Sequence, residues 1–143
     1  MLMTSKISQK ILVPLDGSKN SLRGLNMALV LAKPAEASII GLNVFLCPSV
    51  FRISSEIKNK IKKKSNHIIQ QAESISKKAN VPFTGITKIS NNVGNTIIVF
   101  AEKNGVYMIV MGSRGLDPEL GMFLGSVANH VVIKSKIPVT VVK

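Results

Sequence analysis

Short apolar runs alternate with segments of helical periodicity along this chain, and no other feature limits its fold as much. Runs such as SIIGLNVFL and VYMIVMG have the length and continuity of buried strands. The segments between such runs place apolar residues three or four positions apart, as in an amphipathic helix. Strands that alternate strictly with helices pair in parallel through right-handed crossovers. We therefore predict an α/β fold, a single doubly wound parallel sheet with helices on both faces.

Helix caps, glycine and proline set the expected boundaries of these elements. A first strand from Lys10 ends at the turn residues Asp16 to Ser18, and the next helix, capped by Ser18 or Asn20, stops at Pro34. Further strands are expected over 38–46, 81–90, 106–112 and 137–143, and further helices over about 53–79, 94–104 and about 126–135. The last helix is rich in valine, so propensity alone is equally compatible with a strand there.

The longest expected helix carries two patterns. One is an apolar stripe that we predict to face the core, formed by Ile53, Ile57, Ile61, Ile68, Ala72, Ile75 and Ala79. The other is a crowd of lysines in its first half, at positions 58, 60, 62, 63 and 64. A solvated helix face is the simplest interpretation of such a charge cluster.

Basic residues dominate the charge balance, with 19 Lys and Arg against 7 Asp and Glu and a formal net charge of +12. The electrostatic field of such a positive charge attracts nucleotides, nucleic acids and acidic proteins, and it does not indicate which of them is the partner. Aromatic residues for base stacking make up only 4% of the chain, so recognition of single-stranded nucleic acid is not supported. Salt-sensitive, non-specific binding to DNA or RNA stays open as an alternative.

The remaining composition points to a cytoplasmic protein. No apolar run approaches the roughly 18 residues that a membrane span needs, and no apolar core of a secretion signal precedes Lys10. We expect residues 1–9 to form a short disordered leader and residues 10–143 to form one domain. Cys47 is the only cysteine, which excludes an intramolecular disulfide and fits a reducing compartment.

The sequence contains few residues in patterns typical of catalytic or metal-binding sites. His67 and His130 have no partner at metal-ligand spacing, so we expect no metal site built from side chains alone. Ser113 and Ser126 lack a readable histidine and carboxylate for nucleophilic catalysis. No Walker-type lysine is present to stabilise a transferring phosphate, so any ATP hydrolysis should be slow. These residues favour a binding or sensing protein over an enzyme.

Residues 110–132 hold four glycines within an otherwise apolar, valine-rich segment. The pattern Gly112-x2-Gly115-x9-Gly125-Ser126 is neither a P-loop nor a dinucleotide fingerprint. It places glycine after a predicted strand and before a predicted helix, where backbone N–H groups can approach an anion. Ser126 is expected to cap that helix or to donate its hydroxyl to the ligand. The alternative is a tight turn with close helix packing and no ligand.

At this spacing the sequence resembles the universal stress protein family, in its ATP-binding branch. The segments ILVPLDGS, GLNVF, VMGSRG and LGSVANHVVIKSKIPVTVV are similar to the family's first and second strands, its fourth strand with the following loop, and its closing helix and strand. The resemblance implies a five-stranded sheet with the order 3-2-1-4-5 and a ligand-binding switch point between the strands that end at Asp16 and Gly112. It also implies a homodimer through the edge strand at Ile137 to Lys143.

The resemblance further implies an ATP site, with Asp16 also near a Mg²⁺ ion on the phosphates. In this reading Leu15, Asp16 and Val44 meet the adenosine, and the remaining residues contact the ribose and phosphates. The full set of implied ligand contacts is Leu15, Asp16, Val44, Met111, Gly112, Ser113, Gly115, Gly125, Ser126 and Val127.

One loop departs from the family pattern. Asp117 and Glu119 lie between Gly115 and Gly125, where the family usually has glycine, serine or basic residues. Pointing inward, they repel a triphosphate or bind a bridging cation, whereas a turn at Pro118 directs them outward. We predict a nucleotide-dependent sensor or regulatory module in the stress response. The alternatives are an ATP-independent dimeric interaction module of the same fold and a basic nucleic-acid-associated protein.

Overall fold

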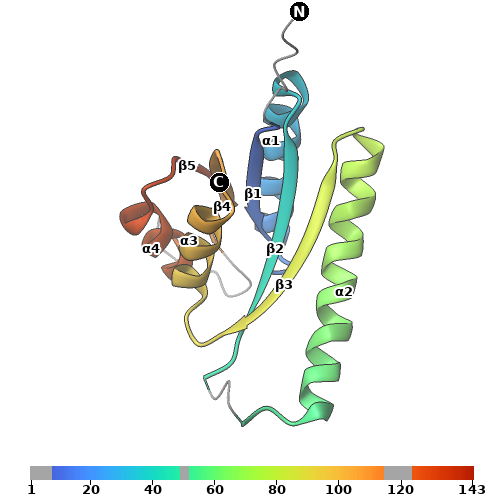
Figure 1. Cartoon of the computed structure of the whole chain (residues 1–143), viewed down its shortest axis with the longest axis vertical. Helices are drawn as coiled ribbons and strands as arrows, with labels where there is room; N and C mark the ends of the chain where they lie inside the picture. The colour runs from blue at the N-terminus through green and yellow to red at the C-terminus, as the bar shows by residue number, and fades with distance from the viewer. Residues whose placement is uncertain (1–7, 49–51, 115–123) are drawn as a thin grey trace, which may run out of the picture.

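The computed structural model describes residues 8–48, 52–114 and 124–143. Nine elements alternate strictly between strand and helix (Figure 1): β1 (Lys10–Pro14), α1 (Lys19–Ala35), β2 (Ser38–Leu46), α2 (Ser55–Lys78), β3 (Phe83–Ser90), α3 (Val93–Lys103), β4 (Met108–Gly112), α4 (Ser126–Lys134) and β5 (Val139–Val142). The predicted leader at residues 1–9 falls largely outside the described residues and stays a prediction.

The five strands form one parallel sheet with the order β3-β2-β1-β4-β5. Both the α/β fold and the strand order expected from the sequence are confirmed. β1 lies at the centre, and the chain leaves it toward β2 on one side and returns to β4 on its other side. The sheet therefore has its switch point between the carboxyl ends of β1 and β4, as the resemblance implied.

Helices cover both faces of the sheet, as predicted, and each pair of helices closes its own hydrophobic cluster. On one face α1 and α2 pack on β1 and β2 through a cluster that includes Leu25, Ala28, Ile39 and Ala72. On the other face α3 and α4 pack through a cluster that includes Leu42, Ile97, Ile109 and Val131. Figure 1 shows α3 and α4 on the side of the sheet that faces the viewer, with α1 behind it.

The start of α1 agrees with the sequence, whereas its end does not. The Ser18 hydroxyl accepts a hydrogen bond from the Ser21 amide at 3.1 Å and caps the helix. Pro34 does not stop the helix, which continues through Ala35 and ends at Glu36, in a left-handed conformation with φ of 51°. Pro34 removes the hydrogen bond that its N–H would make to the Val30 carbonyl. Val30 lies on the exposed side of α1, at 68% exposure, where water can bond that carbonyl instead, so the helix tolerates the proline.

The predicted apolar stripe of α2 is wrong in its first half. The helix begins at Ser55, so Ile53 lies outside it, and Ile57 is 49% exposed. The buried positions are Ser65, Ile68, Ala72 and Ser76. Each buried serine has a partner, since Ser65 Oγ lies 2.5 Å from the Thr87 hydroxyl on β3 and Ser76 Oγ donates to the Ala72 carbonyl. A satisfied hydroxyl can occupy a core position that apolar periodicity does not identify.

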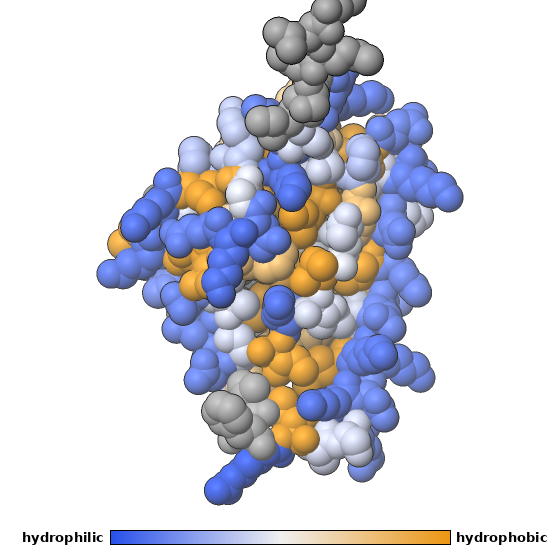
Figure 2. Space-filling model, in the orientation of Figure 1, coloured by the Kyte–Doolittle hydropathy of each residue, from blue (hydrophilic) through white to orange (hydrophobic). Residues whose placement is uncertain are grey.

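The lysines of α2 lie on a solvated surface, in agreement with the simplest interpretation of the sequence. Lys58, Lys60, Lys62, Lys63 and Lys64 are all exposed. Hydrophilic side chains cover the outward side of α2 in Figure 2. Among the described helices, none is long and apolar enough to cross a membrane.

The carboxyl-terminal elements differ from the sequence expectation in extent. The valine-rich segment is a helix, α4, as predicted, with Ala128 and Val131 buried against α3 and the sheet. The last strand covers only Val139–Val142 of the predicted 137–143, and all four residues are half-buried. β5 is an edge of the sheet, paired on one side with β4.

Candidate nucleotide-binding site

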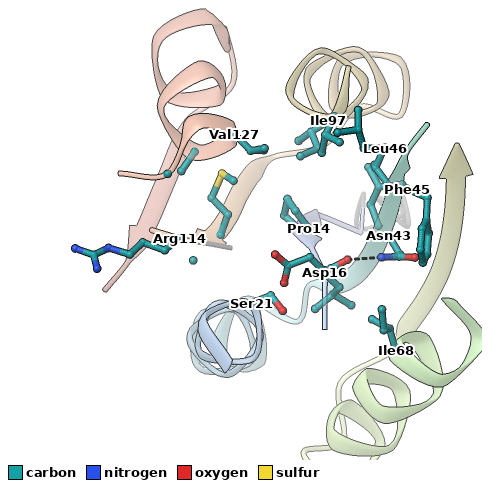
Figure 3. Close-up of a pocket in the computed structure, with 18 of the residues that line it drawn as sticks. Pro14, Asp16, Ser21, Asn43, Phe45, Leu46, Ile68, Ile97, Arg114 and Val127 are labelled. Atoms are coloured by element: carbon teal, nitrogen blue, oxygen red, sulfur yellow. Dashed lines mark hydrogen bonds between the residues drawn. The ribbon is translucent and has the colours of Figure 1, made fainter. Parts of the chain in front are cut away.

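A cavity of about 460 Å³ lies at the carboxyl ends of β1, β2 and β4, at the switch point of the sheet. Its walls come from the ends of these strands, from α1, α2 and α3, and from the start of α4 (Figure 3). Eight of the ten predicted site residues line it: Leu15, Asp16, Val44, Met111, Gly112, Gly125, Ser126 and Val127. Residues that are up to 112 positions apart in sequence therefore meet at one place, which is of the size that small-molecule ligands occupy.

The turn after β1 presents the carboxylate of Asp16 to this cavity. Asp16 Oδ1 accepts a hydrogen bond from the Ser18 amide at 2.8 Å, and Gly17 between them has φ of +87°. This is an Asx turn, and it leads directly into the cap of α1. Figure 3 shows the same carboxylate directed among the cavity-lining side chains. The turn and a ligand contact are thus compatible roles for Asp16.

Gly112 has a packing reason that is independent of any ligand. A Cβ atom at this position would lie 2.5 Å from the carbonyl oxygen of Asn20, at the start of α1. On the other side of the same contact, a Cβ at Gly24 would lie 3.1 Å from the Gly112 nitrogen. The two glycines therefore let α1 approach the end of β4 closely. For Gly112, the alternative of close packing accounts for the residue.

Ser113, the residue after Gly112, is bound to the sheet through its backbone. The Ser113 amide donates to the Val142 carbonyl at 2.8 Å, and the Ser113 carbonyl accepts from the Gly125 amide at 2.7 Å. Ser113 is buried and is not among the residues that line the cavity. Its backbone instead ties the end of β4 to β5 and to the start of α4, so it holds the cavity wall in place.

The start of α4 borders the cavity with backbone N–H groups that precede its helical hydrogen bonds. Gly125 is the N-cap residue, with an extended backbone and no side-chain cap, so the prediction that Ser126 caps the helix is wrong. The first intrahelical hydrogen bond runs from the Asn129 amide to the Gly125 carbonyl at 2.9 Å. The N–H groups of Ser126, Val127 and Ala128 therefore precede the helical ladder, and all three residues line the cavity. Such a helix start attracts anions.

Part of the predicted site cannot be placed. Gly115, Asp117, Pro118 and Glu119 lie outside the described residues, so their predicted roles stay predictions. Arg114 borders the cavity, and Figure 3 shows its guanidinium directed away from Asp16. Within the described ranges, no three His, Cys, Asp or Glu side chains gather as metal ligands.

Several cavity residues were not predicted from the sequence. α2 contributes Lys64 and Ile68, and α3 contributes Val93 and Ile97. Asn43 on β2 is only 2% exposed, and its Nδ2 donates a hydrogen bond to the Leu15 carbonyl at 2.7 Å. A polar residue inside the apolar run SIIGLNVFL was the available signal for Asn43. For the helix residues no local signal exists, because only tertiary packing brings α2 and α3 to the ends of the strands.

This fold and this cavity define a class, the doubly wound α/β proteins with a cavity at the switch point of a parallel sheet. The chain belongs to the universal stress protein family, whose family model matches residues 8–143.

Individual relatives agree with this assignment. The chain is 32% identical to the universal stress protein YxiE of Bacillus subtilis, over 94% of this chain and 98% of the relative. It superimposes on the solved structure of MJ0577 with a TM-score of 0.85 and 28% identity, over 96% of this chain and 97% of the other. A universal stress protein from Archaeoglobus fulgidus, solved in complex with dAMP, shares the fold with a TM-score of 0.74 at 22% identity, over 96% of this chain and all of the other.

Proposed function

We propose that the protein binds an adenine nucleotide, ATP in the first place, in the cavity at the switch point. One observation carries this proposal: the N–H groups that precede the helical hydrogen bonds of α4 and the carboxylate of Asp16 belong to residues that border the same cavity. The N–H groups suit a phosphate, and a carboxylate suits a ribose hydroxyl. A relative of the same family binds dAMP, which supports a nucleotide as the ligand.

The described residues divide into two groups around such a ligand. The phosphates lie against Gly125, Ser126 and Val127, where the helix start favours negative charge. The base and ribose lie against Leu15, Asp16 and Val44, at the ends of β1 and β2. A Mg²⁺ ion, where present, is held chiefly by the phosphates with Asp16 beside it, which matches the way Mg²⁺ is usually bound.

The nucleotide serves as a signal, and turnover is slow or absent. Bound ATP changes the surface that the protein offers to other molecules, so the protein acts as a cytoplasmic sensor or regulatory module in stress. We further propose a homodimer through the segment Ile137 to Lys143, because β5 is a half-buried apolar edge of the sheet. An interaction module that ignores ATP is the second candidate, favoured by the packing explanation of Gly112.

Replacing Gly125 by valine tests whether the nucleotide binds at the start of α4. The substitution is compatible with the formation of this helix. Gly125 has φ of −66° and ψ of 164°, a conformation that any residue adopts, so the variant should fold. The added side chain stands where the phosphates lie, so Gly125→Val should abolish ATP binding in titration calorimetry. Asn129→Val, an exposed position on the same helix, is the matched control and should bind ATP as the wild type does.

The two candidates separate clearly in this experiment. ATP binding that Gly125→Val removes and Asn129→Val keeps supports the nucleotide site. A wild-type protein without titration heat and without thermal stabilisation by ATP supports the ATP-independent interaction module.

A further inference from the structure

β3 is an edge of the sheet, and its free side is open to solvent (Figure 1). It pairs with β2 over Phe83–Ser90, whereas β5 at the other edge has only four residues. Thr84, Gly85, Thr87 and Lys88 are exposed, although they belong to both faces of the strand. Within the described part of the chain, no further strand pairs with this edge. A long strand edge of this kind can accept another strand.

The hydrogen bonds to β2 show which backbone groups of β3 are unused by the sheet. The Ile39 amide donates to the Pro82 carbonyl and the Cys47 amide to the Ser90 carbonyl, both at 2.8 Å. In a parallel pair such bonds recur at every second residue, so the even-numbered residues of β3 bond β2. The N–H and C=O groups at positions 83, 85, 87 and 89 therefore face the free edge. They repeat every two residues, about 6.6 Å apart, as the groups of an extended peptide do.

A basic groove lies on the α3 side of β3. Its volume is about 410 Å³, and it is lined by Lys88 on β3, by residues of α3 and by Asn104, the residue after α3. Lys103 of α3 is the second cation of this groove. Its seven described lining residues include no carboxylate. A side chain of an added strand that enters this groove therefore meets two positive charges, which favour a carboxylate.

The α2 side of the same edge also carries a lysine. α2 packs on the odd-numbered residues of β3, since Ser65 bonds Thr87 and a Cβ at Gly85 would clash with Ile69. Lys62 lies three positions before Ser65, on the same side of the helix, and is exposed. Lysines therefore flank β3 on both of its faces.

This charge selects among the chains that can pair with the edge. A second copy of this protein brings a further net charge of +12 to the same place and is repelled. Nucleic acid meets the lysines but does not use the alternating N–H and C=O groups of the strand. An extended peptide with carboxylates on both faces uses the lysines and the backbone groups together.

We propose that the edge of β3 binds an acidic, extended segment of another protein, which adds a strand to the sheet and places carboxylates beside Lys62, Lys88 and Lys103. The backbone groups of the edge supply the affinity, and the lysines supply the selection for acidic sequences. The inference does not depend on the proposed nucleotide site.

An NMR titration of the wild-type protein with a synthetic peptide tests this inference. The probe is an eight-residue peptide, acetylated and amidated, with two pairs of adjacent glutamates among threonines. We expect the amides at positions 83, 85, 87 and 89 to shift and to become protected from hydrogen exchange, because they are the donors of the free edge. The even-numbered amides of β3, already bonded to β2, are the internal control and should gain no protection.

Charge reversal tests the part of the lysines. Lys88→Glu should weaken binding of this peptide about fivefold, since one exposed cation becomes a like charge. Lys134→Glu is the matched control: it changes the net charge equally, but at the exposed end of α4, so the affinity should change much less. Equal losses in the two variants overturn the inference, because the field of the whole protein then accounts for the binding.

A peptide of the same sequence with every second amide methylated separates strand pairing from charge. It keeps the carboxylates and loses half of its backbone donors, so we expect it not to bind. Equal binding of the methylated peptide overturns the inference. So does tighter binding of a single-stranded DNA of equal charge, which would make the basic surface a nucleic-acid site. A wild-type protein whose edge amides stay unprotected at millimolar peptide also overturns it, and the lysines then only guard the edge against association.

Discussion

Single residues at the site combine packing roles with the ligand roles proposed for them, which the sequence presents as alternatives. Asp16 makes an Asx turn with one carboxylate oxygen and still faces the cavity. Gly112 belongs to a glycine pattern that resembles a nucleotide motif, yet its missing side chain is explained by the approach of Asn20. A glycine in a ligand motif can thus be required by the fold without any ligand, because the close approach of α1 leaves no room for a side chain at Gly112.

The packing role of Gly112 predicts a loss of stability. In Gly112→Ala the new methyl group stands 2.5 Å from the Asn20 carbonyl oxygen, so α1 must shift, and we expect a loss of about 1–3 kcal/mol in unfolding free energy. Urea denaturation measures it. Gly105→Asn is the control, since nothing lies within 4 Å of a Cβ there and asparagine tolerates its φ of +60°. Equal stability of Gly112→Ala and wild type would refute the packing explanation.

Among the elements, α2 departs most from its sequence pattern. Its isoleucines have helical spacing throughout, but only the part from Ser65 onward is buried against the sheet. Periodicity reports which face of a helix can be buried, and the length of its contact with the sheet decides how much of that face is. The same helix supplies Lys64 and Ile68 to the cavity, a contribution that its pattern alone does not indicate.

This division of α2 predicts unequal costs for the same substitution. Ile68 is 8% exposed and belongs to the core, so Ile68→Ala should lower the unfolding free energy by about 2–5 kcal/mol. Ile57 is half exposed, so Ile57→Ala should cost less than about 1 kcal/mol. The urea unfolding midpoints of the two variants, each compared with that of the wild type, measure this difference. Similar losses at both positions would mean that the first turns of α2 are covered in solution.

At the scale of the whole molecule, the open question is how the edge at β5 is covered. Its four residues are half-buried, and apolar side chains of α4, Val132 and Ile133, are exposed nearby in sequence. An unpaired apolar edge strand is a template for association with another chain. The edge is therefore the surface that we propose for the dimer.

A charge on this edge should separate the dimer. Val141 is half-buried and outside both core clusters, so Val141→Lys should convert the dimer to a monomer in sedimentation velocity without unfolding the chain. Thr84→Lys, on the opposite edge strand β3, is the matched control and should leave the dimer intact. Should Thr84→Lys dissociate the dimer and Val141→Lys not, the interface lies at β3 instead.

The sequence by itself determined the order of elements, the parallel sheet and the place of the site along the chain. Alternation of strand and helix leaves few arrangements open, since crossovers are right-handed and ligands bind at the carboxyl ends of strands. Ser18 as the cap of α1 and the turn at Asp16 were available from the sequence because turn and cap chemistry acts over two or three neighbours. Val44 was available only through the resemblance to the family.

Only the tertiary structure decided which residues line the cavity and which residues of α2 are buried. The approach of Asn20 to Gly112, the pairing of Ser65 with Thr87 and the entry of Lys64 into the cavity wall all join residues far apart in sequence. The hydrogen bond of Asn43 belongs to the same group, because it reaches across 28 positions to Leu15. Local patterns carry the information for local structure, whereas burial and hydrogen-bond satisfaction depend on which elements pack together.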